Sequence, residues 1–201
     1  MSPERLAPPY FAQWESPRLI PAFLAGRLAE TDPRWPLSGA ATPEEYGRWA
    51  GHLCGMACLQ MVMAARGEHF PIHALRRAVQ GHGGYVERDG EIRGLIYAGA
   101  VAWLETQGIA ASVELNVNVM RLRGLLRRGL FIASVDPSIR QPAEPPPGRG
   151  GHLVLVFGRD RLGALRFHNP SGDSLANRWD VRLSTADFFP FFSRRGIFIP
   201  C

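Results

Sequence analysis

The chain has 201 residues, of which 46% are hydrophobic and 20% are charged, and its formal charge is +5. This length and composition indicate one globular domain with a sizeable core and exclude a disordered chain. All 23 basic residues are arginines, and the absence of lysine excludes Schiff-base chemistry and a P-loop. The arginines are scattered among 18 acidic residues, so we expect no nucleic-acid partner despite the positive charge.

The chain is expected to be cytoplasmic, without membrane insertion. Its run of large apolar residues at Leu153 to Phe157 is far shorter than the roughly 18 residues that a membrane span requires. The N-terminus lacks the basic region and apolar stretch of a secretory signal. Three cysteines do not make a disulfide framework, but they permit a reactive thiol.

Two parts are expected: residues 1–43 as an arm rich in proline and aromatic residues, and residues 44–201 as the domain on which the arm packs. Along the domain we predict helices, a hairpin turn at Asp89-Gly90 and then strands. The helices fall at residues 55–66, 71–79, 98–107 and 120–128, and the strands at 110–117, 130–135, 153–157, 164–168 and 196–199. A short helix follows Ser184. Helices before an antiparallel sheet predict an α+β fold.

Cys54 is the first candidate functional residue. It lies between the turn-like residues 51–53 and the strongest predicted helix, so the helix N-terminus should stabilise a thiolate there. Gly55 beside it is expected to leave room for a substrate backbone. The alternative is that Cys54 is a small buried apolar residue.

A nucleophilic cysteine needs a base, and the base needs a group that orients it. His152 begins the buried strand 153–157 and is the candidate base. If Asp160 and Arg161 form the tip of the next hairpin, Asn169 lies opposite His152, within reach of its imidazole. The alternative for His152 is a structural histidine.

These residues resemble a known family, the double-glycine, bacteriocin-processing cysteine peptidases, over residues 44–172. The run from Cys54 to Val62 (CGMACLQMV) is similar to the nucleophile helix of the family, and residues 151–158 (GHLVLVFG) to its histidine strand. Residues 167–172 (FHNPSG) match its third motif, with Asn169 where Asp is usual. The resemblance implies a papain-like fold, N-terminal helices packed on a C-terminal antiparallel sheet, and hydrolysis of a peptide, such as a precursor with a leader, through Cys54, His152 and Asn169.

The sequence departs from the family at the oxyanion hole. Arg48 stands six residues before Cys54, where the family has a glutamine, so Arg48 and His52 are the candidate oxyanion donors beside the Cys54 N–H. Three functions remain open at this point. The first is a cysteine peptidase, the second an acyltransferase, peptide ligase or cyclase that uses the same site, and the third a degenerate domain that only binds a peptide.

No cofactor or metal is expected. Cys58 lies one turn after Cys54, but no second Cys/His pair has zinc-ligand spacing. The Pro- and Gly-rich residues 142–151 directly precede His152 and are interpreted as a loop, with a lid over the site as one possibility. The substrate identity and the oligomeric state are not predicted.

Overall fold

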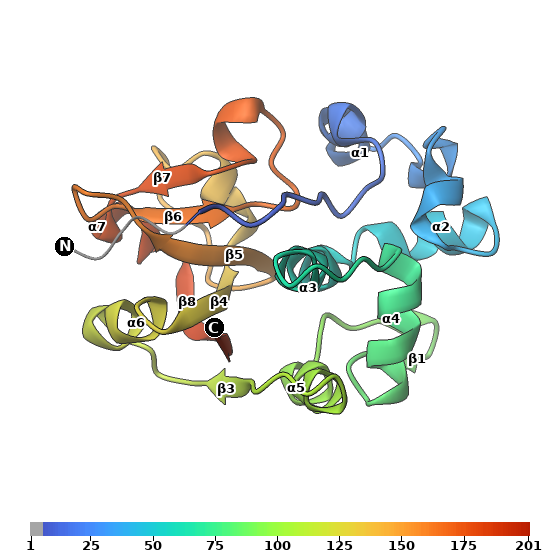
Figure 1. Ribbon diagram of the computed structural model, residues 1–201. Coiled ribbons are helices and arrows are strands. Elements are labelled where there is room, and N and C mark those ends of the chain that lie inside the picture. Colours follow the sequence, from blue (N-terminus) through green and yellow to red (C-terminus); the bar gives the residue numbers. More distant parts are fainter. Residues whose placement is uncertain (1–5) are drawn as a thin grey trace.

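The computed structural model describes residues 6–201, in which a six-stranded antiparallel sheet carries helices on both faces (Figure 1). The helices are α1 (Ile20–Leu24), α2 (Pro43–Ala50), α3 (Cys54–Ala64), α4 (Ile72–Gly81), α5 (Tyr97–Thr106), α6 (Val119–Leu126) and α7 (Thr185–Phe188). The large sheet consists of β3 (Ser112–Glu114), β4 (Gly129–Val135), β5 (His152–Arg159), β6 (Leu165–His168), β7 (Val181–Leu183) and β8 (Phe192–Pro200), in the order β3-β8-β4-β5-β6-β7. A separate hairpin joins β1 (Glu87–Arg88) to β2 (Glu91–Ile92).

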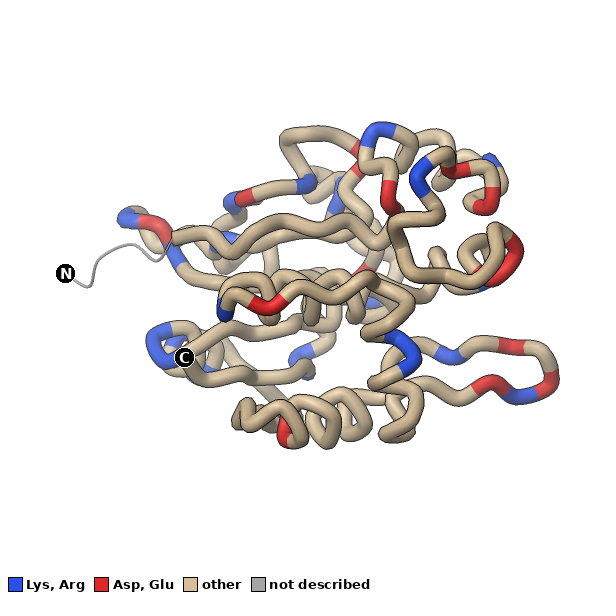
Figure 2. The backbone as a smooth tube through the Cα atoms, turned by 45° about the vertical axis from the view of Figure 1, so that its right-hand side comes forward, with Lys and Arg blue, Asp and Glu red and all other residues tan. Residues whose placement is uncertain are grey.

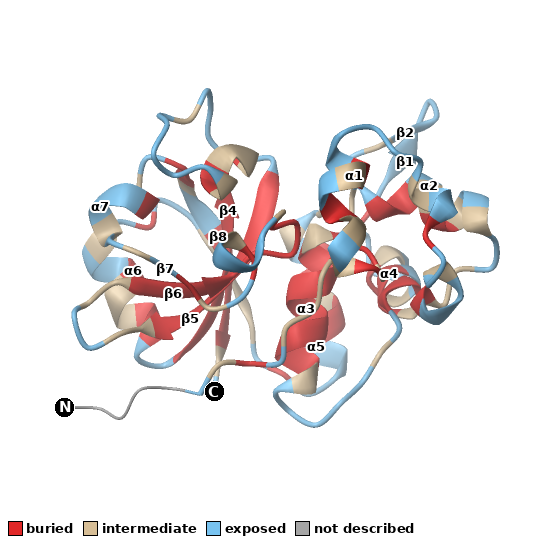
Figure 3. Cartoon of the chain, turned by 90° about the horizontal axis from the view of Figure 1, so that it is seen from above, coloured by how far each residue is buried: buried red, intermediate tan, exposed pale blue. Residues whose placement is uncertain are grey.

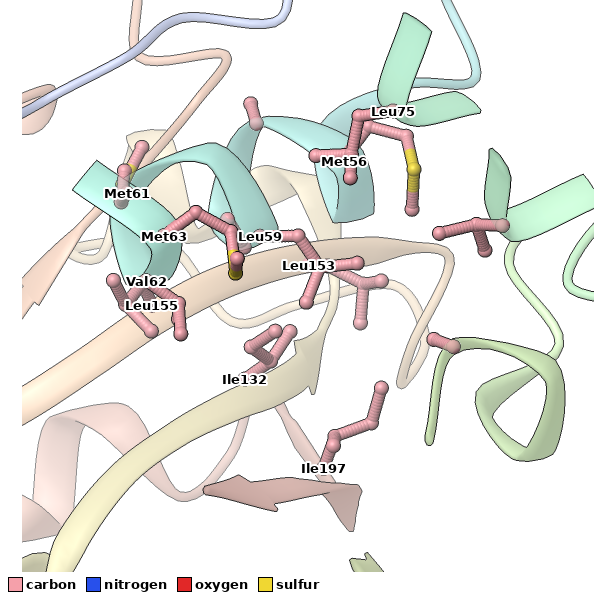
Figure 4. Close-up of a cluster of buried hydrophobic side chains, with 14 of the residues drawn as sticks. Met56, Leu59, Met61, Val62, Met63, Leu75, Ile132, Leu153, Leu155 and Ile197 are labelled. Atoms are coloured by element: carbon pink, nitrogen blue, oxygen red, sulfur yellow. The ribbon is translucent and has the colours of Figure 1, made fainter. Parts of the chain in front are cut away.

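The helix α3 lies at the centre of the molecule. Its residues from Gly55 to Met63 are all buried, because α3 packs against the sheet, α4 and the segment that leads into α5. A helix that is apolar all round is typical of such a buried position. The side chains that meet α3 from the sheet alternate along β5 and β4, and include Leu153, Leu155 and Ile132 (Figure 4).

The other face of the sheet carries a second core. Residues of β4 and β5 with the opposite parity, such as Phe131 and Val154, pack there with α6 and with the phenylalanines around α7. The strands β4 and β5 are therefore buried on both faces, which explains their continuous apolar sequences. Figure 3 shows the sheet and the helices α2 to α5 as two halves that meet along α3.

The predicted elements agree with the structure within a few residues, and the hairpin turn at Asp89-Gly90 is confirmed, with both φ angles positive. Helix α2 was not predicted, although its start carries a clear signal. Thr42 accepts a hydrogen bond from the Glu45 N–H, and Pro43 occupies the first turn. Thr42 and Glu45 have the spacing of a capping box, but the Glu45 carboxylate accepts from the N–H of Ala41, one residue before the N-cap.

The predicted register of β5 and β6 is wrong. Leu155 pairs with His168 and Val156 with Phe167, and a bulge separates Val156 from Gly158. The turn between the strands is longer than two residues, so the pairing is shifted by three residues next to the turn and, beyond the bulge, by two residues at Val156 and Leu155. A shift of two keeps the side chains of this second part on their expected faces of the sheet.

The arm packs through its own small core. Trp14, Ile20 and Phe23 bury their rings and aliphatic groups against Tyr46 and Ala50 of α2. No helix within residues 6–201 is long and apolar enough to cross a membrane.

A buried carboxylate holds this part of the chain together. Asp32 accepts hydrogen bonds from the Ser16 N–H at 3.0 Å, the Ser16 hydroxyl at 2.5 Å and the Tyr46 hydroxyl at 2.8 Å. It also accepts from the Arg34 N–H at 2.9 Å. One side chain thus joins three segments between Ser16 and Tyr46.

Replacing Asp32 by alanine tests this role. Asp32→Ala leaves the Ser16 N–H and the Tyr46 hydroxyl without their acceptor in a buried place, which should lower the free energy of unfolding by about 2–4 kcal/mol. Urea unfolding measures the loss. Arg18→Ala, which changes an exposed charge in the same segment, is the control and should change stability by less than about 0.5 kcal/mol. Equal stabilities of the two variants would contradict the role of Asp32.

Candidate active site

Cys54 begins α3, directly after the short turn that leaves α2. Leu53 takes the N-cap position without a side-chain hydrogen bond, so the first N–H groups of α3 remain free of a side-chain cap. The backbone amides of Cys54 and Gly55, and that of Leu153 in β5, lower the pKa of the Cys54 thiol. The half-buried thiol therefore lies against the strand that begins with His152.

Gly55 is packed too closely for any side chain. A Cβ there would lie 2.6 Å from Cδ2 of Leu95 and 2.9 Å from Cδ1 of Leu153. The expectation that Gly55 leaves room for a substrate backbone is wrong, because these two aliphatic side chains already fill the space. The glycine instead lets α3 lie directly against Leu95 and Leu153.

The expectation of a thiolate stabilised at the helix N-terminus is also wrong. Burial raises the pKa of the Cys54 thiol above its ordinary value. The backbone N–H groups and the positive charge of Arg140 lower this pKa, as expected of a helix N-terminus, but they do not offset the loss of hydration. The thiol is therefore protonated at neutral pH and requires a base to become a nucleophile.

His152 lies at the entrance of β5, after Gly150 and Gly151. Both glycines have φ near +90°, a conformation that other residues rarely adopt. The His152 ring is buried, and its Nε2 lies 2.8 Å from Oδ1 of Asn169. Because Oδ1 can only accept, Nε2 carries the proton, which leaves Nδ1 as the basic nitrogen.

The orientation of the Asn169 amide is determined independently of the histidine. The backbone N–H of Ser171 can only donate, and it lies 3.2 Å from Oδ1 of Asn169. Burial lowers the pKa of His152 to about 4, although the hydrogen bond to Asn169 acts in the opposite direction. His152 is therefore neutral at physiological pH and is able to take a proton.

Two residues behind the imidazole were not predicted. The Ser171 hydroxyl lies 3.0 Å from Nε2 of His152, and Arg140 donates to that hydroxyl at 2.6 Å and to the Ser171 carbonyl at 2.7 Å. Ser171 lies in the turn that follows β6, and Arg140 belongs to a 3₁₀ turn, Pro137–Arg140. No local pattern marks either residue.

One cleft of about 340 Å³ brings the reactive groups together. It is lined by Cys54, His152 and His52 and by residues of the segment before α5 and of the sheet: Gly51, Gly94, Leu95, Tyr97, Ser134, Gly151, Leu153 and Arg195. Asn169 is fully buried and contacts the His152 ring from outside this lining. Of the loop residues 142–151, Gly151 lines the cleft, and a lid movement of this loop stays a prediction.

The two candidate oxyanion donors are placed differently. The Arg48 guanidinium is paired with Glu87 at 2.6 Å and does not line the cleft. Glu87 belongs to the projecting hairpin on which acidic and basic residues gather (Figure 2). His52 does line the cleft, and burial lowers its pKa, so its ring is neutral at pH 7. The structure thus brings His52, but not Arg48, together with Cys54.

No group of three or more His, Cys, Asp or Glu side chains within residues 6–201 is arranged to hold a metal ion. Cys58 is fully buried in the core of α3. His168 faces away from Asn169, with its Nε2 bonded to the Pro8 carbonyl at 2.9 Å, as its parity in the strand predicts.

No protein-family model matches the sequence, and no curated protein does so either. Among solved structures, the chain is similar to the peptidase domain of Streptococcus ComA, a bi-functional ABC transporter involved in a quorum sensing pathway. The TM-score is 0.51 at 19% sequence identity, over 74% of this chain and 91% of that chain. This likeness shows the fold: the chain has the α+β, papain-like architecture of a peptidase domain.

Replacing Asn169 by aspartate tests the contact with His152. A carboxylate at 2.8 Å from Nε2 favours the imidazolium, so Asn169→Asp should raise the pKa of His152 from about 4 by one to three units. NMR titration of the His152 ring protons measures this shift. Asn118→Asp, at the exposed N-cap of α6, is the matched control and should leave the His152 titration unchanged. An unchanged titration in Asn169→Asp would contradict the contact.

Proposed function

We propose that this protein is a cysteine peptidase in which Cys54 is the nucleophile, His152 the general base and Asn169 the residue that orients the imidazole. One observation carries the proposal. The proton of His152 is held on Nε2 by Asn169, so the basic Nδ1 remains free in a ring that shares one cleft with the Cys54 thiol. In His168, by comparison, both ring nitrogens are hydrogen-bonded.

The chemistry follows from these roles. As the Cys54 sulfur forms a bond to the substrate carbonyl carbon, its proton passes to Nδ1 of His152. The N–H of Cys54, and the His52 ring as a second donor, stabilise the negative charge on the carbonyl oxygen. The proton then moves from Nδ1 to the leaving amine as the C–N bond breaks, and a thioester remains.

Water completes the cycle. It attacks the thioester carbon while Nδ1 takes one of its protons, the C–S bond breaks, and the proton returns to the sulfur. Because both Cys54 and His152 are neutral at rest, proton transfer accompanies the attack instead of preceding it. The fold of a peptidase domain supports a peptide as the substrate, and the resemblance of the motifs favours a precursor peptide with a leader.

A second function is favoured by two observations. The thiol pKa is raised, and Arg48 is paired with Glu87 instead of standing beside the thiol. Both observations fit a domain that binds a peptide in the cleft without cleaving it. Turnover distinguishes this binding domain from the peptidase.

Removing the thiol tests the peptidase. With a quenched fluorescent peptide library, Cys54→Ala should lose turnover to the background rate while keeping the affinity for peptides, because the nucleophile is gone and the cleft is not. Cys201→Ser, which removes the exposed terminal thiol, is the control and should retain full activity.

The possible outcomes separate the functions. Equal turnover in Cys54→Ala and in the parent would rule out the proposed nucleophile. Peptide binding without turnover in the parent would assign the binding domain. An amide product that forms only when an amine is added would assign acyl transfer.

The pH profile tests the base. Protonation of Nδ1 abolishes its role, and burial holds the pKa of His152 at about 4, so kcat/KM should stay level as pH falls from 8 to 5 and decline near pH 4. Initial rates across this range measure the profile. A decline near the ordinary histidine pKa of about 6.5 would contradict a buried base.

A further inference from the structure

Arg195 is the one charged side chain that lines the cleft. The remaining lining residues are glycines, apolar residues, a serine, a tyrosine, a cysteine and two histidines that are neutral at pH 7, and none is acidic. Within residues 6–201, Arg195 is exposed and forms no ion pair or hydrogen bond with another side chain. The cleft therefore carries one cation that the chain itself does not neutralise.

The backbone around Arg195 is built to direct its side chain. The pairing of β4 and β8 passes from Ala133–Gly196 to Val135–Phe192, so three residues of β8 lie opposite Ser134 alone. In this bulge, Arg194 has a φ of 58°, a conformation that is uncommon outside glycine. Bulges redirect side chains and are frequent beside active sites.

Two hydrogen bonds hold the bulge in place. The Ser193 hydroxyl donates to the Ser134 carbonyl at 3.0 Å, and the Val117 N–H donates to the Arg194 carbonyl at 2.8 Å. As a result the Arg195 guanidinium extends over Gly150: its Nη2 is 3.6 Å from where a Cβ of that glycine would lie. Gly150 is two residues from His152 along the chain, and Arg195 and His152 line the same cleft.

Two acidic side chains lie outside the lining of the cleft but act on its histidines, Asp136 on His152 and Glu91 on His52. Asp136 accepts from the N–H and the hydroxyl of Ser138, at 2.9 and 2.7 Å. Glu91 belongs to β2, and its charge acts on His52. Neither of these acids lines the cleft, and Arg140 adds a second positive charge that is felt at the Cys54 sulfur.

We propose that Arg195 makes the cleft select substrates that carry a carboxylate next to the bond attacked by Cys54. The carboxylate belongs to an Asp or Glu side chain or to a free C-terminus, and a guanidinium binds either one through two parallel hydrogen bonds. The choice of a peptide as the substrate rests on the proposed peptidase function. The attraction of an anion to the cleft does not depend on that function.

The first experiment therefore needs no peptide. Iodoacetate and iodoacetamide alkylate the same thiol, but iodoacetate carries a carboxylate and iodoacetamide is neutral. The rate with iodoacetate divided by the rate with iodoacetamide at Cys54 therefore reports the electrostatic potential in the cleft. The ratio is measured by mass spectrometry in a Cys201→Ser background and is normalised to free cysteine. Relative to the parent, Arg195→Gln should lower the ratio about fivefold at low salt, whereas Arg127→Gln, on the exposed end of α6, should leave it unchanged.

The second experiment identifies the source of the carboxylate. Turnover by the parent, and binding to Cys54→Ala, are measured for peptide pairs with Asp or Asn, with Glu or Gln, and with a free or an amidated C-terminus. The preferred acid should be favoured about five- to tenfold over its neutral partner. Arg195→Gln should abolish this preference, and Arg195→Glu should reverse it in favour of basic peptides. A simple loss of stability does not produce such a reversal.

Each result bears on one proposal. An alkylation ratio that is the same in Arg195→Gln and in the parent overturns the role of Arg195, whatever the turnover. A ratio that falls while no peptide is bound or cleaved supports the anion site and overturns the peptidase. Peptides cleaved without an acid preference, or with a preference that survives in Arg195→Gln, overturn the selection and leave the peptidase standing.

Discussion

The close approach of α3 to the sheet is the constraint on which the candidate site depends. At Gly55 the helix comes so near to Leu95 and Leu153 that no side chain fits between them. Because Leu153 follows His152 directly, this contact also determines how far the thiol at the start of α3 stands from the imidazole at the start of β5. The packing of the core thus determines the positions of the site residues. A change in that packing would change the separation of the thiol and the imidazole.

The same packing determines the protonation states. Removing Cys54 and His152 from water favours the neutral form of each, which raises the pKa of the thiol and lowers the pKa of the imidazole. The helix N-terminus and Arg140 favour the thiolate, but burial has the larger effect. The thiol and the imidazole are therefore both neutral at rest, and in the mechanism proposed above their charges develop only as the sulfur attacks a carbonyl carbon.

The arm contributes to the site from a distance. The Tyr10 hydroxyl donates to the Asn169 carbonyl at 3.2 Å, the Gln13 N–H to the Pro170 carbonyl at 3.1 Å, and His168 is bonded to the Pro8 carbonyl. These bonds hold the turn that carries Asn169 against residues 8–13. The arm therefore supports the orienting residue, and the Asp32 network in turn ties the arm to α2.

The sequence by itself determined the elements and the candidate residues, because both are written in local patterns. Apolar periodicity marked α3, Asp89-Gly90 marked the hairpin, and the order of Cys54, His152 and Asn169 matched a family with the observed fold. The predicted pairing of Asn169 with His152 rested on a wrong register, yet Oδ1 of Asn169 lies 2.8 Å from Nε2 of His152.

Only the tertiary structure decided what depends on distance between remote segments. The length of the β5–β6 turn moved the register, and the turn after β6 brings Ser171 to the imidazole. Arg48 is paired with Glu87, which lies 39 residues away along the chain on the β1–β2 hairpin. The bulge that directs Arg195 into the cleft arises from the pairing of β4 with β8. Local sequence determines which secondary structure a segment prefers. The partners of each side chain and its burial are properties of the packed chain, and they determine charge and reactivity at this site.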